Sequence, residues 1–242
     1  MFYRLLTCAL LFALCSIPAF AATAEDMAAA LDRADGLPEI ARQADALDKA
    51  SCSGQGGAKA DCALARAYYL LGEGETDKGR RLSYFDRATG RADRALKLEP
   101  ALVHALYWKC MAELQKADLA GGLKALRLVK DALRGFETVA AKDPLYDSAG
   151  AYRSSGKVLI DAPAWAFIGD KKKGMRLLEK AKELAPGCLI NRLYLAQAYQ
   201  KNGRDAEARA EAEYVMRAPV DEKNRKDDLE VKGEAGRLLA GM

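Results

Sequence analysis

Proline recurs at a fixed distance behind a stripe of small and apolar residues, and this spacing limits the fold more than any other feature of the 242-residue sequence. Three prolines follow residues that stand 12, 8 and 5 positions before them, and a fourth set matches with one residue fewer before its proline. The sets are Ala88, Ala92, Ala95 and Pro100; Ala132, Phe136, Val139 and Pro144; Gly174, Leu178, Ala181 and Pro186; and Ala208, Ala212, Val215 and Pro219. Spacing of i, i+4, i+7 predicts one face of a helix, which each proline then ends because it lacks an N–H and clashes with the preceding turn.

A second type of helix precedes three of these stripes. Its members have the same spacing with a small residue in the middle: Trp108, Ala112 and Gln115; Tyr152, Gly156 and Leu159; and Arg192, Ala196 and Tyr199. A small central residue lets two helices of a hairpin approach closely. The pattern resembles the tetratricopeptide repeat, most clearly in the unit from Cys188 to Pro219. That resemblance implies an all-α, right-handed solenoid of antiparallel helix hairpins.

The flanking segments predict further helices. Residues 24–50 fit one broken or two short helices, with Pro38 at a helix start. Residues 61–72 and 78–98 fit another pair, and residues 226–240 fit a capping helix of the kind that stacked repeats need. Residues 157–161 show a hint of strand alternation, which we interpret as helix. We expect residues 22–242 to form a single domain.

The N-terminus predicts export. Arg4 precedes an apolar run over residues 5–17, and Ala19-Phe20-Ala21 has small residues at its first and third positions. This is the pattern of a secretory signal peptide over residues 1–21, cleaved after Ala21. The alternative is a lipid anchor on Cys15, which the bulky Leu14 before it disfavours. We expect a periplasmic protein without a transmembrane span.

Four cysteines remain after that cleavage. Cys52 and Cys62 flank a glycine-rich loop, and an oxidising compartment permits a disulfide between them, which we predict. Two free thiols are the alternative. We expect Cys110 and Cys188 to be small buried residues, and their pairing stays open. The cysteine spacing matches no metal motif, and the single histidine, His104, is distant in sequence.

Catalytic and nucleotide-binding patterns are absent from the sequence. The tract AGAYRSSGKVL at residues 149–159 looks like a phosphate-binding loop, but five residues rather than four separate Gly150 from Gly156, and Val158 follows Lys157 where Ser or Thr is needed. His104 has no nucleophile motif beside it. Without Arg4 the chain has 37 basic and 34 acidic residues, which are interspersed. We therefore expect no enzyme activity, no cofactor and no nucleic-acid partner.

A concave groove is the binding surface that such a solenoid offers. Residues one step past the small-residue positions of the first helices should face it. They are Lys109, Glu113, Lys116, Arg153, Lys157, Leu193, Gln197 and either Gln200 or Lys201. The set is mostly basic, which suits an acidic partner, although an ordinary solvated face is the alternative.

Aromatic residues give a second candidate site. Tyr107, Trp108, Tyr152, Tyr194 and Trp165 lie in or near the first helices and a long loop. Most aromatics at helical spacing belong to a core. Trp165 differs because it lies in a Pro/Ala-rich loop, where it either covers an apolar edge or contributes to a cleft.

Residues 86–219 also resemble a particular branch of this superfamily, the TatT family associated with TRAP transporters. The resemblance rests on DRALKLEPALVHALYWKCMAELQKADLAG, on KDPLYDSAGAYRSSGKVLIDAPAWAFIGDKKKGMRLLEKAKELAP and on NRLYLAQAY. It implies a non-enzymatic scaffold that self-associates, pairs with the solute-binding subunit of a TRAP transporter and holds a small apolar ligand in a cleft. Many relatives look lipid-anchored, whereas Leu14 disfavours that anchor here. The alternative function is a generic tetratricopeptide scaffold for an envelope assembly.

Overall fold

The computed structural model describes residues 22–162, 168–222 and 225–242. This part of the chain is all-helical and contains no strand. Its elements are α1 (Ala24–Asp32), α2 (Leu37–Ala50), the short π-helical η1 (Ser51–Gln55), α3 (Ala58–Glu73), α4 (Lys78–Leu98), α5 (Val103–Ala120), α6 (Gly122–Lys142), α7 (Tyr146–Asp161), α8 (Lys171–Leu184), α9 (Leu189–Lys201), α10 (Asp205–Arg217) and α11 (Arg225–Ala240). The predicted signal peptide and its cleavage site, the alternative lipid site at Cys15, and Trp165 lie outside the described residues.

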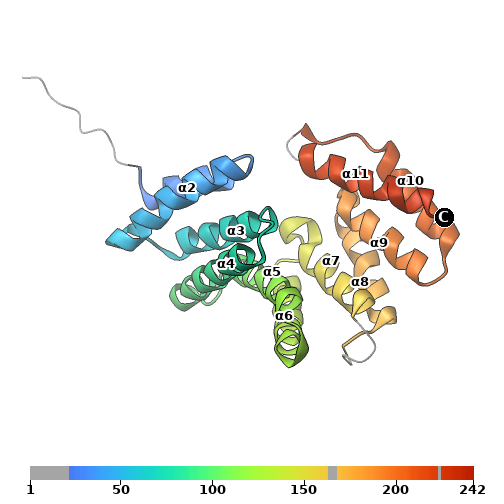
Figure 1. Ribbon diagram of the computed structural model, residues 1–242, viewed down its shortest axis with the longest axis horizontal. Helices are drawn as coiled ribbons and strands as arrows, with labels where there is room; N and C mark the ends of the chain where they lie inside the picture. The colour runs from blue at the N-terminus through green and yellow to red at the C-terminus, as the bar shows by residue number, and fades with distance from the viewer. Residues whose placement is uncertain (1–21, 163–167, 223–224) are drawn as a thin grey trace, which may run out of the picture.

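Four helix hairpins build the solenoid that the repeat predicts. The pairs α3/α4, α5/α6, α7/α8 and α9/α10 each pack closely, and every hairpin also contacts the next (Figure 1). The reversal between α5 and α6 is tightest, because Gly121 alone separates them and adopts a φ of 68°, which favours glycine. The helices α1 and α2 pack on α3 at one end, and α11 packs on α9 and α10 at the other, so the predicted capping helix is confirmed.

The predicted stripes form the core. Ala88, Ala92 and Ala95 of α4 are all fully buried, and so are the corresponding residues of α6 and α10. In α8, Leu178 and Ala181 are fully buried and Gly174 is buried. The three prolines of the exact repeat follow the ends of α4, α6 and α8, as their chemistry requires. Residues 157–161 are helical, and Pro38 lies in the first turn of α2, as predicted.

Polar residues interrupt the apolar core at α7. One continuous apolar cluster runs through α1 to α6 and ends at Ala151, whereas two smaller clusters fill the hairpins from α8 to α11. Between them, α7 buries Arg153, Ser154 and Ser155. Buried polar groups are therefore concentrated in the middle of the solenoid, around α7, and the candidate site described below lies against this helix.

The predicted Cys52–Cys62 disulfide is not formed, and the four cysteines among the described residues are free thiols. Cys52 is exposed in η1, where its Sγ lies 3.8 Å from Oδ1 of Asp48. Cys62 is half-buried on α3 and lines a cavity toward α1 and α5. The two thiols thus occupy different environments. Cys110 is buried, as predicted, and Cys188 is half-buried at the start of α9.

Candidate functional site

Two predicted groove cations of α5 are used to hold α5 against α4. The Nζ of Lys109 lies 2.7 Å from Oδ1 of Asp93 and 3.9 Å from Oε1 of Glu113. The Nζ of Lys116 lies 2.7 Å from Oδ1 of Asp86. Glu113 is mostly buried, and burial raises its pKa. The prediction that these residues form a free basic groove is therefore wrong, because carboxylates of the preceding hairpin neutralise them.

Arg153 is also not a groove residue, because its side chain is only 10% exposed. It reaches the start of α7, where Asp147, Ser148 and Ala149 adopt φ values of 51°, 53° and 65°. Its Nη2 lies 2.5 Å from Oδ2 of Asp147, and its Nη1 donates to the carbonyl of Asp147 at 3.1 Å. A left-handed turn without glycine costs roughly 1–2 kcal/mol per residue. Arg153 offsets that strain by binding the turn.

Two neighbours complete this buried network. Asn191 of α9 donates from Nδ2 to the carbonyl of Ser148 at 2.9 Å and accepts at Oδ1 from Arg153 at 3.1 Å. The hydroxyl of Tyr107 donates to the Asp147 carboxylate, and burial raises the Tyr107 pKa well above its usual value. Residues of α5, α7 and α9 are therefore joined through one guanidinium. This arrangement holds three hairpins together.

Leu193 is buried in the core of the last hairpins, which corrects its placement in the groove. The predicted groove residues Lys157, Lys201 and Gln197 are at least partly exposed, but each is paired. Lys157 lies 2.5 Å from the Asp161 carboxylate and is stacked over the ring of Tyr194, with Nζ 5.2 Å from its centroid. Lys201 of α9 binds the same carboxylate. Gln197 donates to Glu234 of α11 at 3.3 Å. The cations that should attract an acidic partner thus already have anions, which favours the solvated-face alternative.

The Asp161 carboxylate gives a testable dependence of stability on pH. Burial opposes its ionisation, but hydrogen bonds from Lys157 and Lys201 prevail and lower its pKa below 3.8. A lowered folded pKa contributes stability that is present above the unfolded value and is lost as the pH falls through the folded value. The Asp161→Asn variant should therefore have a lower thermal unfolding temperature than the unchanged protein near neutral pH. The difference between the two temperatures should vanish in acid. A difference that persists in acid would contradict this assignment.

The predicted cleft aromatics separate into three environments. Tyr107 is fully buried and packs edge-on against Trp108 and Phe136, with ring centroids 5.1 and 5.7 Å away. It belongs to the core, which corrects its assignment to a cleft. Trp108 lines one cavity and Tyr152 lines another. Tyr194 lies beneath the ammonium group of Lys157. Trp165 lies outside the described residues.

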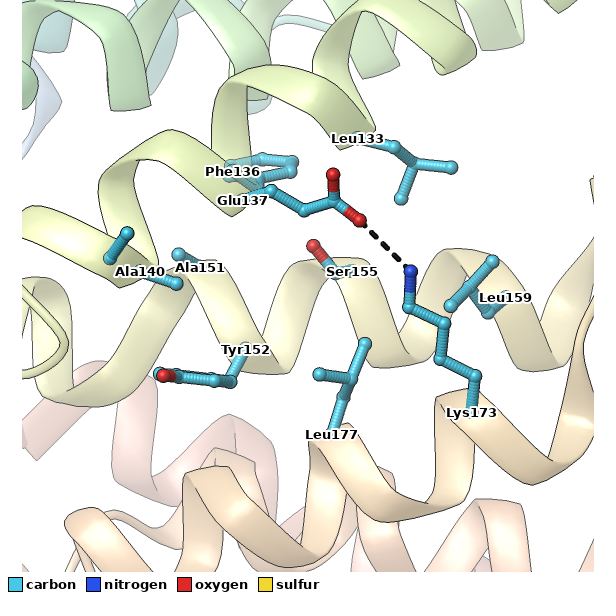
Figure 2. A pocket seen from close by; sticks show the side chains of 11 residues that line it. Leu133, Phe136, Glu137, Ala140, Ala151, Tyr152, Ser155, Leu159, Lys173 and Leu177 are labelled. Carbon is cyan, nitrogen blue, oxygen red and sulfur yellow. Dashed lines mark hydrogen bonds and ion pairs between the residues drawn. The ribbon is translucent and has the colours of Figure 1, made fainter.

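The cavity that Tyr152 lines lies between α6, α7 and α8 and has a volume of about 310 Å³. Figure 2 shows α7 as its floor, with α6 and α8 as its walls. The lining is mostly apolar: Leu133, Phe136, Ala140, Ala141, Ala151, Leu159 and Leu177, with Tyr152, Ser155, Glu137 and Lys173 as its polar members. An apolar concavity with a few polar groups is the usual form of a small-molecule site. We call it the α6–α8 pocket.

One ion pair joins the walls of this pocket. The Nζ of Lys173 lies 2.9 Å from Oε1 of Glu137, and the dashed line in Figure 2 marks this contact. The two side chains are 45% and 63% exposed, so the pair is worth less than about 1 kcal/mol. Such a weak contact can open without a large cost, which leaves access to the apolar lining.

A second cavity, of about 610 Å³, opens between α1, α3 and α5. Trp108 donates from Nε1 to the hydroxyl of Tyr146 at 2.7 Å, and His104 stacks on Tyr146 with ring centroids 4.0 Å apart. The charges at its rim form their own ion pairs, Lys59 with Glu25 and Arg66 with Asp32. Burial raises the pKa of its Cys62 thiol to about 12, so the reactive thiolate does not form near neutral pH.

Sequence patterns identified only part of these sites. Tyr152 was singled out, whereas Lys173, Glu137 and the apolar lining of α6 were not. The available signal was the basic run Lys171-Lys172-Lys173 directly before a buried stripe.

No group of three or more His, Cys, Asp or Glu residues in the described ranges could hold a metal ion. No helix in those ranges is both long and apolar enough to cross a membrane.

Comparison with known proteins adds no relative: no protein-family model and no curated protein matches this chain.

Proposed function

We propose that this protein is a non-enzymatic periplasmic adaptor that binds a small apolar ligand in the α6–α8 pocket and associates with the solute-binding subunit of a TRAP transporter. The pocket is the observation that carries the ligand part, because its lining is mostly apolar and the Glu137–Lys173 pair that joins its walls is weak. The likeness of residues 86–219 to the TatT family supports the partner and the location. The helical-repeat fold supports a scaffolding role.

The pocket proposal predicts a loss of ligand binding when the cavity is filled. Ala140→Leu adds bulk to the α6 wall and should weaken binding of a neutral apolar fluorescent probe, such as N-phenyl-1-naphthylamine, by roughly tenfold. Thr138→Leu on the exposed face of the same helix is the matched control and should leave probe affinity unchanged. Equal probe affinity in the two variants would place the probe elsewhere and refute the pocket.

The adaptor proposal predicts a specific partner. Capture with the tagged protein from a periplasmic extract, followed by mass spectrometry, should recover a TRAP solute-binding subunit. Recovery of other envelope proteins without that subunit would favour the generic scaffold. A monomeric mass with no partner recovered would contradict both forms of the proposal.

A further inference from the structure

Positive charge is concentrated on the two helices that wall the α6–α8 pocket. In α6 five Lys or Arg residues stand against two acidic residues, and in α8 six stand against two. The helices therefore carry net charges of +3 and +4, whereas the whole sequence carries +4. The rest of the chain is consequently net acidic, by −3, and the basic surface is a local feature.

The cations form an exposed stripe on each helix. Arg127, Lys130 and Arg134 follow i, i+3, i+7 spacing on α6, and all three are exposed. Lys172 and Arg176 are exposed one turn apart on α8. None of these five cations lines the α6–α8 pocket, so both stripes lie outside it on the two helices that form its walls. We call these two stripes the basic face.

In the described part of the chain, three of the five cations of the basic face, Lys130, Lys172 and Arg176, lack the partners that the groove cations have, whereas Arg127 and Arg134 share Asp131 of their own helix. Other cations of α6 and α8 are unpaired there as well. Among the described residues, none of the following lies within salt-bridge distance of a carboxylate: Lys124, Lys130, Lys142, Lys171, Lys172 and Arg176. By contrast, Lys109, Lys116 and Lys157 are each paired with an aspartate. Positive charge that is not neutralised within the chain is available to an external anion.

We infer that the basic face docks on the surface of an anionic lipid bilayer. Lipid phosphates complement the cation stripes, and each Lys or Arg near such a surface adds to the affinity. Leu123 stands four residues before Arg127 on the same face of α6 and is 85% exposed. An apolar side chain at the edge of a basic stripe suits the boundary between lipid headgroups and acyl chains. This inference does not depend on the ligand of the α6–α8 pocket or on the transporter partner.

The test is co-sedimentation with vesicles of phosphatidylcholine that contain phosphatidylglycerol, compared with vesicles of phosphatidylcholine alone. The unchanged protein should bind only the anionic vesicles, and concentrated salt should release it because the screening length falls to about 3 Å at 1 M. The variant Lys130→Glu, Arg134→Glu, Lys172→Glu, Arg176→Glu should lose on the order of 1,000-fold in affinity. Circular dichroism establishes that each variant is folded.

A matched control separates the basic face from net charge. Lys49→Glu, Lys97→Glu, Arg209→Glu, Lys226→Glu makes the same change in net charge at exposed cations on other helices. This variant should keep most of its vesicle affinity. Polyglutamate serves as an anionic polymer that has no acyl chains. Leu123→Ser should weaken vesicle binding roughly tenfold, because an apolar contact is lost, and leave any binding to polyglutamate unchanged.

Three outcomes would overturn the inference. They are no binding of the unchanged protein to anionic vesicles, an equal loss of affinity in the two fourfold variants, and binding to polyglutamate without binding to vesicles. The last result would assign the basic face to an acidic protein.

Discussion

Arg153→Met is expected to lower the free energy of unfolding by about 3 kcal/mol, measured by denaturant unfolding. Removing one partner of a buried ion pair costs about 3–5 kcal/mol because the other charge is left unpaired. We expect the lower end of that range because the Asp147 side chain is 38% exposed and water can reach it. The loss has a second cause, because the left-handed turn at 147–149 loses a donor to its carbonyl groups.

Two comparisons sharpen this experiment. Arg153→Lys keeps the charge but not the planar fork, so its stability should fall between those of the unchanged protein and Arg153→Met. Arg134→Met removes an arginine whose side chain is 74% exposed and should change stability by about 0.5 kcal/mol or less. If Arg153→Met weakened partner binding while stability stayed unchanged, Arg153 would be a groove residue after all.

Gly156→Ala is expected to destabilise the protein by about 2–3 kcal/mol, although alanine is the better helix former. A Cβ at position 156 would lie 2.9 Å from the carbonyl oxygen of Gly174 and 2.7 Å from Cγ of Leu178. The first atom belongs to the backbone of α8, which cannot move without separating the two helices. The contact is mutual, because a Cβ at Gly174 would lie 2.9 Å from the carbonyl oxygen of Gly156.

A glycine-to-alanine substitution at an open position of another helix should stabilise the protein instead. Gly90 lies within α4, and a Cβ there would meet no atom within 4 Å. Gly90→Ala should therefore stabilise the protein by about 1 kcal/mol through helix propensity alone. The two variants are compared by thermal unfolding under identical conditions. Equal changes at both positions would show that α7 and α8 do not meet at Gly156.

The helix-crossing positions could be predicted from the sequence because they follow from local rules. A residue every three or four positions must share a helix face, and a proline must end the helix. The stripe of α4 and the small residues Ala112, Gly156 and Ala196 are accordingly buried, and Gly156 lies where the two helices of one hairpin meet. The same logic explains why AGAYRSSGKVL forms a helix crossing. Gly156 of this tract has no side chain, so α7 and α8 can approach each other closely there.

The candidate groove could not be predicted in the same way. Spacing placed Lys109, Lys116 and Arg153 on a helix face, but the partner of each cation belongs to another element or to a turn. Lys109 pairs with Asp93 across a hairpin junction, and Asn191 reaches Arg153 from α9, 38 residues away. A charged residue looks the same in sequence whether it faces solvent or a carboxylate from a distant helix.

The helices, their pairing into hairpins and the residues at their crossings thus follow from local sequence patterns, because these depend on neighbours within a few turns. Which charges are neutralised and where a cavity remains depend instead on how distant helices pack. The α6–α8 pocket exists because α6 and α8 stand apart above α7. The basic face exists because, among the residues that the structure describes, no carboxylate of another element forms an ion pair with Lys130 or Arg176. Both depend on distances between helices that are far apart in the chain, which local spacing does not encode.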